Sequence, residues 1–441
     1  MSFPAYPAYR DSGVTWLGEV PSHWIRMPLF ALVRELDDDN VGMKEDNLLS
    51  LSYGQIKRKN IDDNDGLLPA SFETYQIIEK DDIVWRLTDL QNDQRSLRTG
   101  IVRERGIITS AYLATRPVAI EPEFLSYLLR AYDQIKVFYS MGGGLRQSMK
   151  FSDVKWLPVA LPSPVEQVAI AAFLDRETAK IDALVEEQRR LIALLKEKRQ
   201  AVISHAVTKG LNPDAPMKDT GIEWLGEVPA HWEVTALKRH WSVTDCKHVT
   251  AEFVDDGFPL ASIREVQSRF VNLDDAKQTT ADFYDALIEG NRKPEAGDLI
   301  FSRNATVGEV AQVADWHPPF AMGQDVCILK RIVPSSSSDF LQFVIRSRMI
   351  IEQLANVMIG STFKRVNVEE IRNLIVTFPP ADEQQVLARH IDLVCTNFDR
   401  LTAEAASAIS LLHERRAALI SAAVTGKIDV RGLVPRQAEA A

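Results

Sequence analysis

Side chains that can read flat hydrogen-bonding partners gather in one loop of each half of the chain. In the first half, a strand-like run at residues 82–85 is followed by Arg86, Thr88, Gln91, Asn92, Gln94, Arg95 and Arg98. In the second half, a strand-like run at 299–301 is followed by Ser302, Arg303, Asn304 and Thr306. Arginine can donate two parallel hydrogen bonds to guanine, and asparagine or glutamine can pair with adenine. These residue types favour contact with base edges, although a solvated surface loop can have the same composition.

A glycine turn with basic and hydroxyl neighbours follows a helical stretch in each half. The first is residues 142–144, followed by Arg146, Gln147, Ser148 and Lys150. The second is Gly360, followed by Ser361, Thr362, Lys364 and Arg365. Glycine lets the main chain approach a phosphate closely, and nearby Lys or Arg adds salt-sensitive affinity. Both turns are candidate phosphate contacts, and unliganded surface loops are the alternative.

Signatures of catalysis are missing from the sequence. It contains no GxxxxGK[ST] phosphate loop, no GxGxxG after a strand, no HExxH, no GxSxG and no Cys/His cluster. It also lacks the Asn-Pro-Pro-Tyr/Phe motif with which an amino-methyltransferase holds a flipped base. His23 and His231 each precede a tryptophan, and we expect a structural role for both. We therefore predict no catalytic residue, no metal and no cofactor on this chain.

The elements that must position the loops are repeated. Residues 9–24 (YRDSGVTWLGEVPSHW) return as residues 217–232 (MKDTGIEWLGEVPAHW), with ten identities at one constant offset. Such a dense match indicates two copies of one structural unit. Each copy carries two tryptophans, Trp16 and Trp24 or Trp224 and Trp232. We expect them to pack against the strand or helix that closes each unit, with partner docking as the alternative.

A second repeat, with a slightly longer offset than the first, closes each unit. Residues 157–167 (LPVALPSPVEQ) match residues 374–384 (LIVTFPPADEQ) in an apolar run, a proline stop and a Glu-Gln pair. Proline followed by an acidic first turn is typical of a helix start. The first of these helices has no proline or glycine from Glu166 to about Thr208. A run of roughly 40 residues at 1.5 Å each reaches ~60 Å, so both helices are predicted to be long.

The spacing of apolar residues in the two helices predicts a mutual coiled coil. The predicted seam of the first helix is Glu177, Ile181, Leu184, Gln188, Leu191, Leu195, Lys198 and Val202, and the second helix repeats this spacing from Val394 to Leu419. Gln188 and Lys198 either fix the register or are exposed. The helices also end alike, in AVTKG and AVTGK. Two unrelated surface helices are the alternative, which the matching lengths, seams and ends oppose.

Composition and charge narrow the class of protein. A chain of 441 residues with 46% hydrophobic and 25% charged residues is typical of a globular protein of two or three domains. No apolar stretch approaches the ~20 residues that cross a bilayer, and the N-terminus lacks a signal-peptide pattern. Three separated cysteines without CxxC spacing fit a reducing cytoplasm. The net charge of −10 opposes a bare nucleic-acid-binding protein, although basic clusters can coexist with an acidic total.

This layout resembles the DNA specificity subunit of type I restriction-modification systems. The resemblance covers nearly the whole chain and rests on the WLGEVPxHW boxes at 16–24 and 224–232, the Glu-Gln junctions and the helix ends. It implies an α+β fold with a pseudo-twofold internal repeat. Two mixed α/β target recognition domains (1–162 and 211–379) would be separated by two long helices (163–210 and 380–428) forming an antiparallel coiled coil. A tail, 429–441, would follow.

The resemblance also implies partners and a function. Each recognition domain would read one half of a split double-stranded DNA site, and the coiled coil would set the spacer between the halves. The helices would also dock two modification subunits, which methylate adenine with S-adenosylmethionine. Motor-nuclease subunits, which use ATP and Mg²⁺, would join that core. The chain itself would be non-catalytic.

Two functions from other classes compete with this expectation. A catalytic DNA enzyme with a fused recognition half is opposed by the missing motifs. A coiled-coil scaffold that binds only proteins is opposed by the two dissimilar, polar, glycine-rich variable segments.

Overall fold

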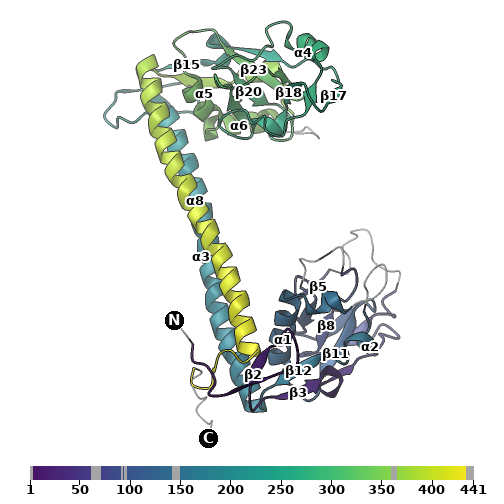
Figure 1. Cartoon of the computed structure of the whole chain (residues 1–441). Coiled ribbons are helices and arrows are strands. Elements are labelled where there is room, and N and C mark those ends of the chain that lie inside the picture. The colour runs from purple at the N-terminus through teal and green to yellow at the C-terminus, as the bar shows by residue number, and fades with distance from the viewer. Residues whose placement is uncertain are drawn as a thin grey trace. The chain divides into compact units, whose positions relative to one another are not determined.

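The chain divides into two compact units, each holding one globular domain and one half of each long helix. The computed structural model describes residues 3–60, 71–90, 93, 97–141, 149–358 and 365–433. Unit 1 comprises Met1–Gln188 and Ser407–Ala441, and unit 2 comprises Arg189–Ala406. Helices α3 (Pro164–Lys209) and α8 (Ala381–Val424) therefore run through both units (Figure 1).

Unit 1 is built from strands and short helices that precede α3. Its strands are β1 (Tyr9–Asp11), β2 (Glu19–Pro21), β3 (Ile25–Pro28), β4 (Val33–Glu35), β5 (Leu49–Ser52), β6 (Gln55–Arg58), β7 (Gln76–Ile78), β8 (Ile83–Trp85), β9 (Thr99–Ile101), β10 (Gly106–Ile108), β11 (Leu113–Pro117) and β12 (Pro158–Leu161). Its helices are η1 (Leu29–Ala31), α1 (Pro122–Gln134), η2 (Val137–Ser140) and α2 (Phe151–Val154).

Unit 2 repeats this order between α3 and α8. Its strands are β13 (Met217–Asp219), β14 (Glu227–Pro229), β15 (Glu233–Ala236), β16 (Trp241–Asp245), β17 (Phe253–Val254), β18 (Phe258–Ala261), β19 (Gln278–Thr279), β20 (Leu299–Ser302), β21 (Val310–Gln312), β22 (Ala321–Met322), β23 (Val326–Arg331) and β24 (Ile375–Phe378). Its helices are η3 (Leu237–Arg239), η4 (Ile263–Val266), α4 (Ala281–Ile288), α5 (Ser338–Ile345), α6 (Arg348–Met358) and α7 (Val368–Arg372).

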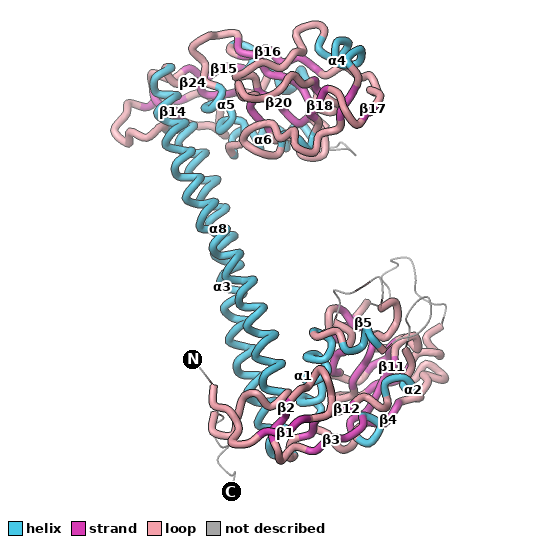
Figure 2. The backbone as a smooth tube through the Cα atoms, viewed as in Figure 1, coloured by secondary structure: helices cyan, strands magenta, loops and turns pink. Residues whose placement is uncertain are grey.

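The two domains share one central sheet topology although their sequences barely resemble each other. The strand order is β4-β11-β8-β9 in unit 1 and β16-β23-β20-β21 in unit 2, and every pairing in both sheets is antiparallel. Figure 2, with strands in magenta and helices in cyan, shows the mixed strand and helix content of both domains. The expected α+β fold with a repeated architecture is confirmed.

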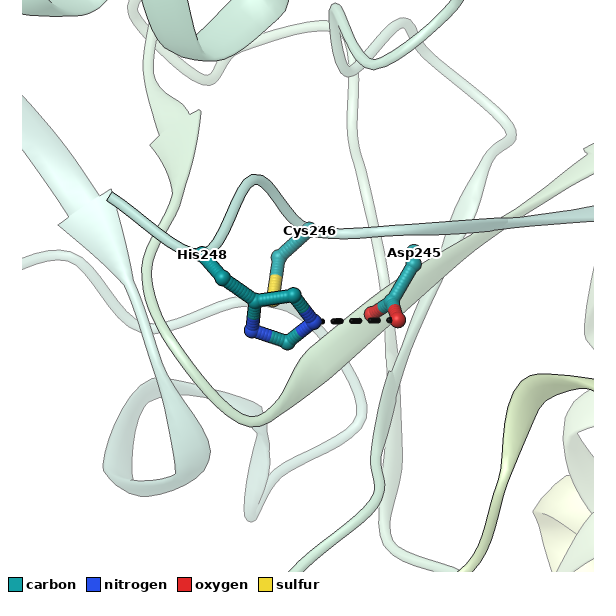
Figure 3. A group of neighbouring side chains, drawn as sticks. All are labelled: Asp245, Cys246 and His248. Carbon is teal, nitrogen blue, oxygen red and sulfur yellow. Dashed lines mark hydrogen bonds and ion pairs between the residues drawn. The ribbon is translucent and has the colours of Figure 1, made fainter.

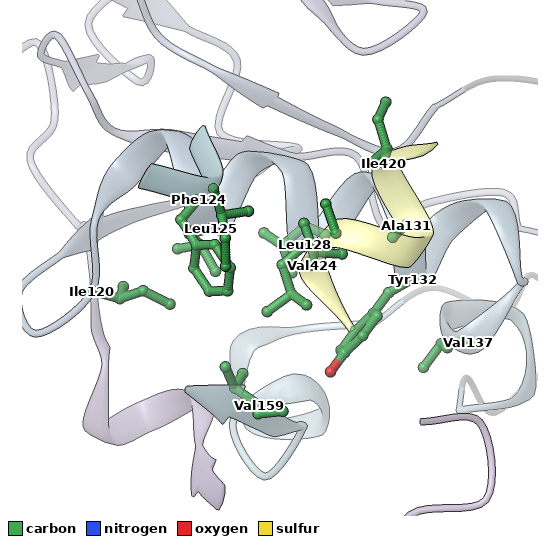
Figure 4. Close-up of a cluster of buried hydrophobic side chains, with 14 of the residues drawn as sticks. Ile120, Phe124, Leu125, Leu128, Ala131, Tyr132, Val137, Val159, Ile420 and Val424 are labelled. Atoms are coloured by element: carbon green, nitrogen blue, oxygen red, sulfur yellow. The ribbon is translucent and has the colours of Figure 1, made fainter. Parts of the chain in front are cut away.

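The central strand of each sheet is buried on both faces. Because successive side chains point to opposite faces, Leu299 and Phe301 join one core and Ile300 joins another. In β8, Ile83 and Trp85 likewise join one core and Val84 joins another. In unit 1 the first of these cores continues into the long helices: Figure 4 shows Phe124 and Leu128 of α1 near Val424 of α8 and Val159 of β12.

The repeated Glu-Gln pair at the start of each long helix joins three parts of its unit. The Glu166 carboxylate accepts hydrogen bonds from Trp24 Nε1 (3.2 Å) and lies 3.0 Å from His23 Nε2. The Gln167 side chain accepts from the Glu121 main-chain N–H (2.8 Å) and donates to the Pro162 carbonyl (2.9 Å). Since Glu121 is the N-cap of α1, this pair connects the tryptophan box, the globular domain and the long helix. We call it the Glu-Gln bracket.

The second bracket has the same geometry with one difference. Gln384 accepts from the Ser337 main-chain N–H (2.8 Å) at the N-cap of α5 and donates to the Pro379 carbonyl (2.8 Å). His231 Nε2 lies 2.7 Å from Glu383 Oε2. Within the described chain, however, the buried Trp232 Nε1 has no hydrogen-bond partner.

The packing predicted for the tryptophan boxes holds for one tryptophan of each pair. Trp24 and Trp232 are each 1% exposed. Trp16 and Trp224 are 38% and 44% exposed, so they lie at the surface of their units, and Trp16 meets Tyr132 edge-on with ring centroids 6.4 Å apart.

The long helices are antiparallel, and half of the predicted seam is shifted by one residue. Asp182 of α3 pairs with Arg416 of α8 in unit 1, and Arg199 pairs with Asp399 in unit 2. The buried or half-buried seam positions of α3 are Leu174, Thr178, Ile181, Val185, Gln188, Ile192, Leu195, Arg199, Val202 and Ala206. The positions of α8 that match them in the repeat, from Ile391 to Ala423, are buried or half-buried as well.

The one-residue shift has a simple cause in the sequence. Leu184 and Leu191 were expected in the seam but are 49% and 42% exposed, whereas their neighbours Val185 and Ile192 face inward. Adjacent apolar residues allow a 3–4 spacing to be placed in two phases. The prediction was right at Ile181, Gln188, Leu195 and Val202 and was one residue too early at Glu177, Leu184, Leu191 and Lys198. In the described part of the chain, no helix is long and apolar enough to cross a membrane.

Candidate functional site

The buried side chain of Arg98 holds the loop after β8 in unit 1 through hydrogen bonds. This side chain is fully buried, so it does not present its guanidinium at the surface, and the expectation of a base contact is replaced by a structural role. Its Nη1 donates to the Thr88 carbonyl (3.1 Å) and its Nε to Tyr139 Oη (3.1 Å), and Nη2 donates to the Asp93 carbonyl. Arg98 therefore fixes the path of the loop.

Two half-buried members of the same loop, Arg86 and Thr88, keep part of their surface available for contact. The Arg86 side chain is 33% exposed and lies 3.8 Å from Asp93, and Thr88 is half-buried. Asp89 adopts a left-handed backbone with φ 57°, which turns the chain beyond the strand. The predicted contacts Gln91, Asn92 and Arg95 lie outside the described residues.

A buried acidic side chain, Asp133, lies beside Arg98. Asp133 on α1 accepts a hydrogen bond from the Arg98 main-chain N–H at 2.6 Å and is 1% exposed. Burial raises the pKa of the Asp133 carboxyl, although that N–H and nearby cations partly oppose the shift. The loop is thus tied to the sheet and to α1 through buried polar groups.

The loop after β20 in unit 2 mixes buried supports with exposed tips. Ser302 and Arg303 are 0% and 3% exposed, and Ser302 Oγ donates to the Asn304 carbonyl at 3.1 Å. Asn304 is half-buried and Thr306 is exposed. The four predicted contacts therefore fall into two groups. Ser302 and Arg303 support the loop, while Asn304 and Thr306 can face a partner.

The segment after each glycine turn lies beside its loop in both units. The Met149 main-chain N–H donates to the Leu87 carbonyl at 2.9 Å, and the Val366 N–H donates to the Arg303 carbonyl at 3.0 Å. Lys150 and Arg365, the residues next to these contacts, are both exposed. The structure thus brings Lys150 and Arg365, the described members of the glycine-turn clusters, close to the predicted loops. The other turn residues, Arg146, Gln147, Ser148, Ser361, Thr362 and Lys364, lie outside the described residues.

The two loops have equivalent geometry despite unrelated sequences. Asp89 and Ala305, which occupy equivalent places beyond β8 and β20, have φ values of 57° and 56°. Positive φ is uncommon for residues other than glycine, so its recurrence marks the same turn in both units. Each unit presents a strand end, this left-handed turn and an adjoining basic segment.

Two exposed glutamines of unit 2 were missed by sequence reasoning. Gln267 Nε2 donates to Thr306 Oγ1 at 2.9 Å, and Gln324 precedes Asp325, whose carbonyl accepts from the Arg303 N–H. Gln267 comes from the region after η4 and Gln324 from the turn before β23. No local pattern in the sequence connects either residue with the loop, since only the sheet brings them together.

A group of three side chains beneath the unit 2 loop has a metal-ligand composition but a different role. Asp245, Cys246 and His248 offer ligand atoms within 4.8 Å of one another (Figure 3). Arg303 Nη1 donates to Asp245 Oδ2 at 2.9 Å, and burial raises the pKa of the Cys246 thiol. Since an adjoining guanidinium opposes a cation and a protonated thiol is a weak ligand, we assign Asp245 to the support of Arg303.

Comparisons with known proteins agree with this arrangement. Residues 265–409 match the family model described as "Type I restriction modification DNA specificity domain". The type I restriction enzyme MjaVIII specificity subunit of Methanocaldococcus jannaschii is 21% identical over 345 residues, which are 75% of this chain and 76% of the relative.

Solved structures share the fold of nearly the whole chain. A chain from a structural study of assembly and conformational transition of the type I R-M system has a TM-score of 0.68 at 15% identity, covering 92% of this chain and 98% of the other. The HsdS subunit from Thermoanaerobacter tengcongensis has a TM-score of 0.50 at 15% identity, covering 93% and 98%. At this identity the likeness shows the fold.

These findings identify the class of protein as a type I restriction-modification specificity component. Together, the family match, the relatives and the fold confirm the resemblance found in the sequence. The chain is similar to the specificity subunits of type I restriction-modification systems, which are non-catalytic DNA-recognition components.

Proposed function

We propose that each unit reads one half of a two-part double-stranded DNA site. The observation that carries this proposal is the equivalence of the two loops: the same sheet topology, the same left-handed turn and the same adjoining segment occur in both domains. Different side chains on one scaffold are what two different half-sites need, because base edges are distinguished by side-chain donors and acceptors.

The antiparallel helices act in this proposal as the spacer between the half-sites. Their seams repeat with the same offset as the brackets that hold the domains. A coiled coil with a regular seam is stiff, so its length fixes how far apart the two reading loops act.

The partners follow from the family and belong to the same proposal. Two modification subunits dock on the chain, bind S-adenosylmethionine and methylate adenine, and motor-nuclease subunits bring ATP and Mg²⁺. The chain itself binds none of these cofactors. We place the complex in the cytoplasm, where the buried free thiols of Cys246, Cys327 and Cys395 stay reduced.

Methylation mapping tests the proposal directly. A host that expresses this chain with its modification subunit is compared, by long-read sequencing, with the same host lacking the chain. We expect N6-methyladenine in a split motif that disappears with the chain. Methylation that is independent of the chain, or confined to an unsplit motif, would contradict the proposal and favour a scaffold.

A further inference from the structure

Two arginine pairs occupy equivalent places in the two units. In unit 1, Arg130 of α1 is repelled by Arg416 of α8, and in unit 2, Arg346 after α5 is repelled by Arg199 of α3. Arg199 and Arg416 have the same offset as the bracket glutamines, and Arg130 and Arg346 come within one residue of it, so the pairs follow the internal repeat. Each pair lies where a recognition domain meets the seam of the long helices.

The helix arginine of each pair has an aspartate partner. Arg416 Nη1 lies 3.1 Å from Asp182 Oδ1, and Arg199 Nε lies 3.4 Å from Asp399 Oδ1. The aspartates, too, stand at matching positions of the repeat. The charge of the helix arginine is therefore balanced within each unit, and the two units differ only in how they treat the arginine from the domain.

Unit 2 satisfies its domain arginine with protein acceptors. Arg346 Nη2 donates to the Val310 carbonyl at 2.7 Å and to the Ser268 carbonyl at 2.8 Å. The Glu309 carboxylate lies 3.8 Å away. The buried Arg346 Nε, like Arg130 Nε, has no hydrogen bond among the described residues, so the protein acceptors in unit 2 engage Nη2.

Unit 1 leaves its domain arginine without such acceptors. Arg130 Nε is buried without a hydrogen bond, and no described residue forms a hydrogen bond or ion pair with the Arg130 guanidinium. Burial lowers the pKa of Arg130, and repulsion by Arg416 lowers it further. Burying a cation costs free energy when its N–H donors make no hydrogen bonds, unless a partner supplies acceptors for them.

A cavity of about 310 Å³ lies beside Arg130 in unit 1. Its lining includes Gly54, Gln55, Tyr127, Arg130 and Arg416. The carboxylates near Arg130 have other partners, because Glu123 pairs with Arg103, Asp182 pairs with Arg416 and Asp133 accepts from the Arg98 main-chain N–H. Among the described residues the guanidinium of Arg130 has no ion-pair partner, so it is open to an anion from outside the chain.

We propose that the cavity binds a phosphate group of the DNA backbone through Arg130 and Arg416. Guanidinium groups bind phosphate through paired, charge-assisted hydrogen bonds. Such a contact adds affinity and fixes position without reading sequence. It lies outside both recognition loops, and in unit 2 the matching arginine, Arg346, donates to carbonyl groups instead. This inference rests on the proposed function, since DNA supplies the phosphate.

The experiment measures DNA affinity against salt for the full chain assembled with its modification subunits. Fluorescence anisotropy on a duplex with the mapped motif compares the wild type with Arg130→Gln, Arg130→Lys and Arg400→Gln. Arg400, in an exposed pair with Glu404 on α8, is the matched control for the loss of one positive charge.

We expect Arg130→Gln to weaken binding about tenfold on all duplexes and to reduce the slope of log K against log salt by about one. Arg130→Lys should keep the slope, and Arg400→Gln should leave both quantities near wild type. The melting temperature of Arg130→Gln should be no lower than that of the wild type, because Arg130 has no hydrogen-bond or ion-pair partner to lose among the described residues.

Several outcomes would overturn the inference, and they differ from failure of the proposed function. Equal slopes for Arg130→Gln and Arg400→Gln in a complex that still binds DNA would remove the phosphate contact alone. Stabilisation of the wild type by inorganic phosphate at constant ionic strength, with an unchanged DNA slope in Arg130→Gln, would assign the cavity to free phosphate. Loss of modification subunits from Arg130→Gln would indicate a protein carboxylate instead. A wild-type complex that does not bind DNA would contradict the proposed function itself.

Discussion

Arg98 and Arg303 show that residue type alone does not separate a reading side chain from its support. Both were expected to contact bases, and both are buried beneath the loops that carry the exposed candidates. Arginine suits either role, because its fork of donors binds a guanine edge or several carbonyl groups equally well. The sequence could indicate candidate loops but not the side chains that face outward, since burial depends on packing with distant segments such as α1.

The contrast between Arg86 and Arg98 gives the first prediction. Arg98→Ala removes hydrogen bonds to buried carbonyl groups and should cost roughly 3 kcal/mol or more of unfolding free energy. Arg86→Ala, at a side chain that is 33% exposed, should cost less than about 1 kcal/mol and instead weaken DNA binding. Thermal unfolding followed by circular dichroism, together with anisotropy, distinguishes the two. An Arg98→Ala protein as stable as the wild type would show that the hydrogen bonds of Arg98 are not needed for stability.

The Glu-Gln brackets explain why the sequence repeats are so well preserved between the two halves while the domains differ. Each bracket glutamate pairs with the histidine of its tryptophan box. Each bracket glutamine accepts a hydrogen bond from the main chain at the N-cap of a domain helix. These repeated elements could be predicted because their residues are close in sequence or match across the repeat. The shared sheet order could not, because pairs such as β4 with β11 join segments about 80 residues apart without a local signal.

The two bracket glutamates provide a matched pair for the second prediction. Glu166 is 4% exposed and accepts from Trp24 Nε1, whereas the Glu383 side chain is 30% exposed and leaves Trp232 Nε1 without a hydrogen bond among the described residues. Glu166→Gln should therefore lower stability by about 1–2 kcal/mol, and Glu383→Gln by less than about 1 kcal/mol. Thermal unfolding of both variants checks the order. A larger loss for Glu383→Gln would contradict the bracket geometry.

The seam of the long helices gives the third prediction. Its positions recur every seven residues, so inserting seven residues after both Leu191 and Ala408 keeps the seam and adds about 10 Å. At 3.4 Å per base pair, the spacer of the methylated motif should grow by roughly three base pairs with both half-sites unchanged. Four-residue insertions at the same points shift the seam by about 40° and serve as the control, with weakened assembly expected. An unchanged spacer after the seven-residue insertion would contradict the spacer role.

At the scale of the whole molecule, the chain is two similar units whose cores are separate. Each domain has its own hydrophobic cores, and the long helices contribute to a core in each unit. The dense repeat of the tryptophan boxes predicted this doubling correctly. Separate cores imply that a change in one loop is not transmitted to the other domain, since substitutions without shared contacts usually act independently.

The independence of the units gives the fourth prediction. Asn304→Ala combined with Thr306→Ala removes two outward-facing side chains of unit 2 and should relax the second half-site, with about 1–3 kcal/mol of discrimination lost for each base contact removed. The first half-site should stay intact. Methylation mapping of the variant measures both halves in one experiment. Relaxation of the two halves together would show that the units are coupled.

The Glu-Gln brackets have a consequence for how such a chain can evolve. Gln167 and Gln384 hold their domains through main-chain atoms, at Glu121 in one unit and Ser337 in the other. Main-chain donors are present whatever the side chain, so the frame places few demands on the sequence of the domain that it carries. A gene segment for a different domain could be exchanged by recombination between the repeats and still be seated correctly. New DNA targets would then arise by replacement of whole domains, with the frame unchanged.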